Sequence, residues 1–165
     1  MTAPAFHGCF PHNWTAEILP QRPMILPNRH YVYPAAVEEV EKGALEVLVQ
    51  PGRPESDEDR GKPQPFLATC ALGFRDRAAL TGIWALPDPD WLCAVSGGYA
   101  YLINTASPEQ FTHLHYRPVL AILHYPSGEL QNYADDFRRS EKSPDRFCDE
   151  LLLLTGHHSI VAWGT

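Results

Sequence analysis

The chain has 165 residues, 44% of them hydrophobic, and a net charge of −7. This length suits one domain spanning residues 1–165 with a buried core, and the composition excludes a disordered polyelectrolyte, a collagen-like chain and a coiled coil. The acidic charge disfavours nucleic acid and anionic membranes as partners. The N-terminus lacks the basic and apolar regions of a secretion signal, so we expect a cytoplasmic location.

Residues 1–35 carry six prolines between large apolar residues. Because proline fixes φ and cannot donate a hydrogen bond to a central strand ladder, this segment is expected to form an extended arm packed across a sheet. Two further stretches predict exposed polar loops. Residues 51–65 combine four prolines with many charges, and residues 129–149 mix charges of both signs.

Short apolar runs follow one another along the chain, separated by proline and glycine turns. They include residues 44–50, 66–74, 82–86 and 119–125. Such spacing is typical of strands in an all-β protein. We therefore predict about seven to nine antiparallel strands connected as a meander, forming a two-layer sandwich or a partial propeller-like stack.

The clearest local signal is a hairpin over residues 91–105 that turns at Gly97 and Gly98, because glycine readily adopts the positive φ of a tight turn. Ser107–Gln110 then resembles a capping box and predicts one helical turn. Residues 151–164 predict a second hairpin around Gly156. They align with residues 92–105 without gaps, which indicates two copies of one hairpin.

The four cysteines are widely spaced and form no C-x-x-C pair, which predicts reduced thiols and not a metal or redox site. Cys70 and Cys93 lie inside apolar runs, where a thiol behaves as a small hydrophobic group. The others are Cys9 and Cys148.

Two resemblances accompany these patterns. The segment LCAVSGGYAYLINTASPEQF resembles the inner strand pair of a β-propeller repeat. Gly82-Ile83-Trp84, GYAYLINT and the final AWG are similar to uncharacterised bacterial all-β proteins of greater length, for which no activity is known. This second resemblance implies more sequence after AWG in those proteins, so we expect here either a shortened relative or a truncated reading frame, with an exposed sheet edge.

Histidines provide the most suggestive candidates for metal ligands. On a strand, His113 and His115 would point to one face and reach one metal ion, as imidazole pairs do in cupin-like barrels. The cupin pattern also has a glutamate a few residues later, and residues 116–120 contain none. A metal-dependent, cupin-like enzyme using His113 and His115 is therefore the alternative function.

The favoured function is a non-enzymatic, cytoplasmic protein-binding module. The sequence contains no nucleophile elbow and no phosphate-binding glycine loop, so we assign no catalytic residue and no cofactor. Partners are expected to be another protein or a second copy of the chain. Trp84 and Trp163 are predicted core residues, while the candidate binding residues, chosen as aromatic side chains and histidines near the hairpins, are Trp91, Tyr99, Tyr101, His157 and His158.

Overall fold

The computed structural model describes residues 4–34, 43–52, 64–73, 78–115, 118–125, 151–156 and 160–164. It is all-β and sandwich-like, as the sequence predicts: these residues form three sheets, none closed into a barrel, and include no helix. Within them, therefore, no helix is long and apolar enough to cross a membrane. His157, His158, residues 129–149 and most of residues 51–65 lie outside the described ranges.

The central sheet has five strands, and four of them form the predicted antiparallel meander. Its fifth strand, β1, pairs in parallel with β6. In spatial order the strands are β1 (Ala5–His7), β6 (Gly82–Ala85), β7 (Trp91–Ser96), β8 (Tyr99–Asn104) and β9 (Phe111–His113).

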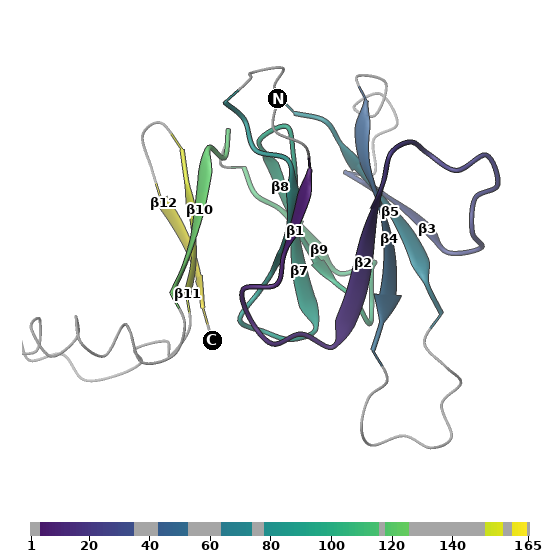
Figure 1. Cartoon of the computed structure of the whole chain (residues 1–165), viewed down its shortest axis with the longest axis horizontal. Coiled ribbons are helices and arrows are strands. Elements are labelled where there is room, and N and C mark those ends of the chain that lie inside the picture. Colours follow the sequence, from purple (N-terminus) through teal and green to yellow (C-terminus); the bar gives the residue numbers. More distant parts are fainter. Residues whose placement is uncertain are drawn as a thin grey trace, which may run out of the picture.

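The four-stranded sheet covers one face of the central sheet, and the three-stranded sheet covers the other (Figure 1). The four-stranded sheet contains β2 (Trp14–Leu19), β4 (Ala44–Pro51), β5 (Phe66–Ala71) and β3 (His30–Tyr33), in that order, with β3 parallel to β5. The three-stranded sheet is antiparallel and contains β10 (Ala121–Tyr125), β11 (Leu151–Thr155) and β12 (Ile160–Gly164). The fold thus has three layers, one more than the two-layer sandwich that is one of the two arrangements the sequence predicts.

Burial follows from this layering. Strands β7 and β8 are buried on both faces, because the central sheet has a neighbour on each side. Three buried hydroxyl groups join elements across the core. Tyr33 donates to the Pro108 carbonyl at 2.7 Å, and Tyr101 donates to the Ala71 carbonyl at 3.1 Å. Ser96 Oγ also donates to the Cys70 carbonyl at 3.0 Å, linking the central and four-stranded sheets.

The predicted hairpin over residues 91–105 is confirmed. Strands β7 and β8 pair from Trp91–Asn104 to Ser96–Tyr99, and Gly97 and Gly98 form the turn with φ of 54° and 83°. The second hairpin is also present, but its innermost pair is Thr155–Ile160. Four residues therefore separate β11 from β12, against two between β7 and β8, so the gapless alignment does not describe equivalent turns.

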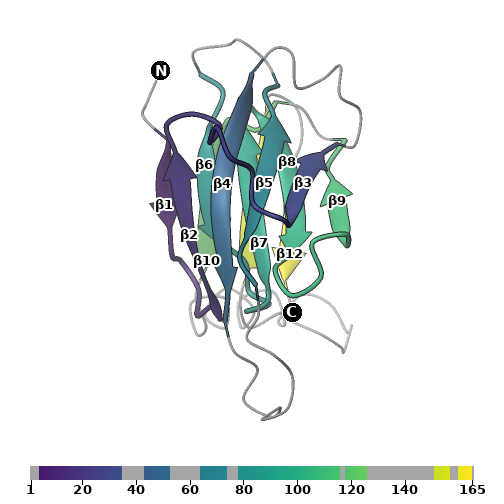
Figure 2. The ribbon, with the colours of Figure 1, turned by 90° about the vertical axis from the view of Figure 1, so that its right-hand side faces the viewer.

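The N-terminal segment does not lie across a sheet as predicted. It supplies β1, β2 and β3, which are edge strands of the central and four-stranded sheets. Proline is compatible with this arrangement because the prolines fall between these strands and not within them. Figure 2 shows β1 and β2 along the same side of the molecule.

The predicted helical turn at Ser107–Gln110 is instead a tight turn, closed by the Gln110 amide donating to the Ser107 carbonyl.

Cys70 and Cys93 are fully buried free thiols, as predicted, and Cys9 is half-buried. Burial raises the pKa of Cys93 to about 12 and also raises that of Cys70. The reactive species of a thiol is the thiolate. We therefore expect Cys70 and Cys93 to stay unmodified by a disulfide reagent in the native protein and to react once urea unfolds it, as peptide mass spectrometry would show. Labelling of either thiol in the native state would contradict this burial.

Candidate functional site

The predicted aromatic binding residues do not form one exposed patch. Tyr101 is fully buried, so it belongs to the core and cannot contact a partner. Trp91 is half-buried, and its ring packs against that of Trp163 in the three-stranded sheet, with ring centroids 6.1 Å apart. Tyr99 is also half-buried and packs against His113. Trp84 is buried and Trp163 packs against the core, as predicted.

His113 and His115 lie close together, but not on one strand face as predicted, because β9 ends at His113. Their ring centroids are 6.1 Å apart, and the His113 ring stacks on Tyr101 at 4.7 Å. In the described part of the chain, no group of three or more His, Cys, Asp or Glu side chains is placed to hold a metal ion. The histidine pair therefore gains no third ligand from these residues.

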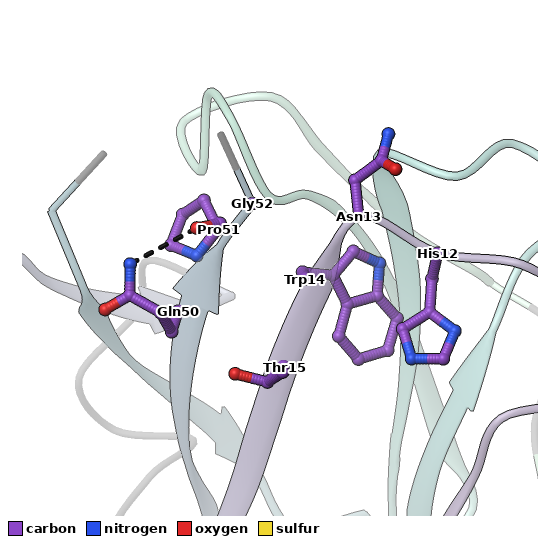
Figure 3. A pocket seen from close by; sticks show the side chains of 7 residues that line it. All are labelled: His12, Asn13, Trp14, Thr15, Gln50, Pro51 and Gly52. Carbon is purple, nitrogen blue, oxygen red and sulfur yellow. Dashed lines mark hydrogen bonds between the residues drawn. The ribbon is translucent and has the colours of Figure 1, made fainter. Parts of the chain in front are cut away.

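A shallow pocket of about 390 Å³ opens beside the start of β2 and the end of β4 (Figure 3). His12 is the one titratable side chain in its lining, and its Nδ1 donates to the Phe10 carbonyl at 2.8 Å. The lining thus lacks the paired acid and base that general acid–base catalysis uses. It consists of His12, Asn13, Trp14, Thr15, Gln50, Pro51 and Gly52.

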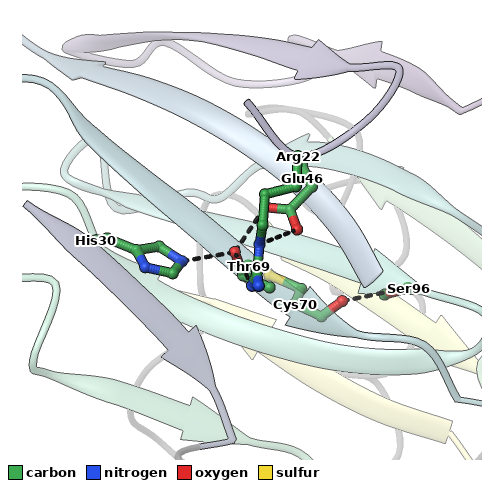
Figure 4. A network of polar contacts seen from close by, with 6 residues as sticks. All are labelled: Arg22, His30, Glu46, Thr69, Cys70 and Ser96. Atoms are coloured by element: carbon green, nitrogen blue, oxygen red, sulfur yellow. Dashed lines mark hydrogen bonds and ion pairs between the residues drawn. The ribbon is translucent and has the colours of Figure 1, made fainter. Parts of the chain in front are cut away.

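A polar network that the sequence analysis did not identify lies on the four-stranded sheet (Figure 4). The Glu46 carboxylate, on β4, is 6% exposed and accepts hydrogen bonds from two residues. Arg22 Nε donates to its Oε1 at 3.1 Å, and the buried Thr69 hydroxyl donates to its Oε2 at 2.6 Å. Arg22 Nη2 also donates to Thr69 Oγ1 at 3.3 Å, which closes a ring of contacts among the three residues.

The hydrogen-bond directions show that His30 is not a base for the Thr69 hydroxyl in this network. Thr69 has one hydroxyl proton, and it points to the Glu46 carboxylate, which can only accept. His30 Nε2, 2.9 Å from Thr69 Oγ1, must therefore be the donor in that contact. A histidine that donates to a hydroxyl cannot remove its proton, so His30 does not activate Thr69.

The network anchors the loop Pro20–Arg29, which runs from β2 to β3 and which we call the apolar loop. Arg22 lies near its start and bonds to side chains of β4 and β5. His30 directly follows the loop and bonds to a side chain of β5. Further along, Arg29 Nη1 donates to the Gln64 carbonyl at 3.1 Å. Both ends of the loop are thus tied to the sheet.

The tip of the apolar loop projects into solvent. Met24 is 101% exposed and Ile25 is 88% exposed, the highest values among the exposed large hydrophobic residues, and Leu26 follows at 43%. Pro23 and Pro27 flank these three residues, and Pro20 begins the loop. Each proline fixes its own φ. The loop therefore loses less conformational freedom on being held in one shape than a loop without prolines would. The loop contains two arginines and no acidic residue.

The network also predicts a pH dependence of stability. Burial and the neighbouring Arg22 guanidinium lower the pKa of His30 below its usual 6.5, against the opposing effect of Glu46. The unfolded chain therefore binds more protons at this residue as the pH falls through 6.5, and the free energy of unfolding decreases. Urea unfolding at about pH 8 and about pH 5.5 should show this loss, and His30→Gln, which keeps a donor but does not titrate, should reduce it. An equal loss in His30→Gln would assign the effect to other groups.

The sequence carries only weak signals for this network. Glu46 belongs to the apolar run over residues 44–50, and a carboxylate on such a strand ordinarily faces water. Arg22 lies in a stretch without acidic residues, so its carboxylate partner had to come from a distant strand, 24 residues away.

Comparison with family models, with curated proteins and with solved structures found no match.

Proposed function

We propose that the protein is a non-enzymatic protein-binding module and that the apolar loop is its recognition element. The observation that carries the proposal is the near-complete exposure of Met24 and Ile25 on a loop whose ends are tied to a sheet. Large apolar side chains gain free energy when a partner covers them, and a loop held in one shape loses less entropy on binding.

Charge favours a protein partner over a membrane. The chain as a whole carries a net charge of −7, which opposes an anionic bilayer. The Arg22 and Arg29 guanidinium groups are bonded to the sheet and its neighbouring backbone, so they are not free to extend toward lipid head groups. Each retains further N–H donors, which suit acidic groups on the surface of a partner protein.

The test uses a phage library that displays protein fragments encoded by the genome of the source organism. Clones selected on the immobilised chain are sequenced, purified as soluble fragments and titrated against Met24→Ser/Ile25→Ser. We expect binding to weaken at least about tenfold, because two apolar side chains are removed from the interface. The urea midpoint should stay unchanged, since both side chains are exposed in the free protein.

The matched control is Gln21→Ser/Asn28→Ser, which changes two exposed polar residues of the same loop and keeps its apolar tip. This variant should bind the selected fragments as the unmodified chain does. The proposal is overturned if no selected fragment distinguishes Met24→Ser/Ile25→Ser from the unmodified chain. It is also overturned if the apolar tip instead mediates binding to phosphatidylserine vesicles.

A further inference from the structure

The sulfur-bearing side chains in the described part of the chain differ sharply in exposure. Cys70 and Cys93 are fully buried, and Cys9 is half-buried, with its Sγ donating to the His7 carbonyl at 3.5 Å. Met24 is the opposite extreme, at 101% exposure. The sequence has two methionines, and Met24 is the one that lies in the described ranges. Among these residues, its thioether is therefore the sulfur most open to small reagents in the solvent.

The shape of the apolar loop keeps Met24 exposed in the folded protein. Arg22 and Arg29 tie the two ends of the loop to the sheet and its neighbouring backbone. Pro23 and Pro27 flank the tip, and each proline fixes its own φ. The tip thus has little freedom to fold back and bury the thioether, so the folded chain offers this sulfur to a reagent much as an unfolded chain would.

A thioether, unlike a thiol, does not have to lose a proton before it reacts. The reactive species of cysteine is the thiolate. Burial raises the pKa of the Cys9 thiol above its usual value and that of Cys93 to about 12, so both thiols resist ionisation. The sulfur of methionine carries its lone pairs at any pH. Access therefore governs its oxidation, and access is complete at Met24.

We propose that Met24 is a site of reversible oxidation by peroxides and that the added oxygen converts the tip of the apolar loop from apolar to polar. In the forward step, the sulfur attacks one peroxide oxygen, a sulfur–oxygen bond forms and the oxygen–oxygen bond breaks. The sulfur loses two electrons to the peroxide, and the departing hydroxide takes up the remaining proton and leaves as water. A thiol-dependent methionine sulfoxide reductase reverses the change, because two thiols become a disulfide and the oxygen leaves as water.

Oxidation changes the property that the proposed function uses. Met24 and Ile25 are the two most exposed large hydrophobic side chains of the described residues, and a sulfoxide places a polar oxygen beside Ile25. A partner that covers the tip would then have to bury this oxygen, which costs free energy unless a donor meets it. Loss of binding on oxidation therefore rests on the proposed function, whereas the oxidation and the change in polarity do not.

Peroxide treatment of the full chain, followed by peptide mass spectrometry with fragmentation, tests the site. We expect Met24 to gain one oxygen at rates that agree within about threefold in the native chain and in the chain unfolded in urea, because folding does not shield it. A sulfoxide reductase with dithiothreitol should then remove the oxygen. A larger protection of native Met24, or an oxygen that the reductase leaves in place, overturns the inference.

Met24→Leu is the matched variant, since leucine keeps the tip apolar and takes up no oxygen. On a hydrophobic interaction column, the oxidised chain should elute earlier than the untreated chain, and peroxide should leave the elution of Met24→Leu unchanged. An unchanged elution of the oxidised chain contradicts the change in polarity. An equal shift in the two chains assigns that change to other residues and contradicts it as well.

Titration with the selected library fragments separates this inference from the proposed function. The oxidised chain should bind them at least about threefold more weakly, and Met24→Leu should bind them equally well before and after peroxide treatment. If no fragment binds through the tip but Met24 is oxidised and the elution shifts, the proposed function fails and the oxidation site stands. If the fragments bind through the tip but Met24 is shielded from peroxide, or if oxidation leaves their binding unchanged, the inference fails and the proposed function stands.

Discussion

Arg22→Ala is expected to lower the free energy of unfolding by about 2–3 kcal/mol, because it leaves the nearly buried Glu46 carboxylate without its cationic partner. The Arg22 side chain is itself 43% exposed, so solvent screening keeps the loss below that of a fully buried pair. Urea unfolding measures this change. The apolar loop should also become more susceptible to limited proteolysis, since Arg22 ties its beginning to the sheet.

A double-mutant cycle with Glu46→Gln separates the ion pair from its surroundings. The glutamine amide oxygen can still accept a hydrogen bond from the Thr69 hydroxyl, and without a charge at position 46 the absence of Arg22 matters less. We therefore expect Arg22→Ala/Glu46→Gln to lose less stability than the sum of the single variants, by about 1 kcal/mol or more. Additive losses would show that Arg22 acts through packing and not through Glu46.

Gly98→Ala is expected to lower the free energy of unfolding by about 2–3 kcal/mol, because it strains the turn between β7 and β8. The φ of Gly98 is +83°, which side-chain-bearing residues rarely adopt. An added Cβ would also lie 2.8 Å from Cβ of Pro118 and 3.3 Å from Cβ of Ala79, closer than packed carbon atoms approach. Thermal unfolding followed by circular dichroism gives the change.

Gly97→Asn is the matched variant in the same turn. Its φ of 54° lies in the left-handed region, which asparagine tolerates and which tight hairpins favour at this position. We expect a loss of less than about 1 kcal/mol there. Equal losses at the two positions would contradict the assigned turn geometry.

The hairpin over residues 91–105 was predictable because its information is local: two apolar runs and two adjacent glycines specify it without reference to the rest of the chain. The same holds for β4 and β5, whose apolar runs end at turn residues. The burial of the Cys70 and Cys93 thiols was predictable for the same reason, because both cysteines lie inside apolar runs and a cysteine inside a buried strand is itself buried.

The remaining features depend on contacts between distant residues. Nothing near Ala5–His7 indicates pairing with Gly82–Trp84, so the N-terminal segment was expected to lie on a sheet and not to extend two of them. A third layer was not predicted. In sequence, a central strand buried on both faces differs from a strand buried on one face only in how many apolar residues it carries. The Glu46 network joins four segments, and the loop that it anchors became a candidate only once Met24 and Ile25 were seen to be exposed.

The parallel edge strands have a consequence for how the protein forms during its synthesis. Strand β1 is the first described strand to leave the ribosome, yet its partner residues 82–84 are synthesised more than 70 residues later. Strand β3 likewise cannot pair until residues 67–70 have been synthesised. The N-terminal strands must therefore remain unpaired while the middle of the chain emerges. Such late closure between distant segments is typical of slowly folding proteins, so the nascent chain would present β1 and β3 to chaperones or to neighbouring chains before its sheets are complete.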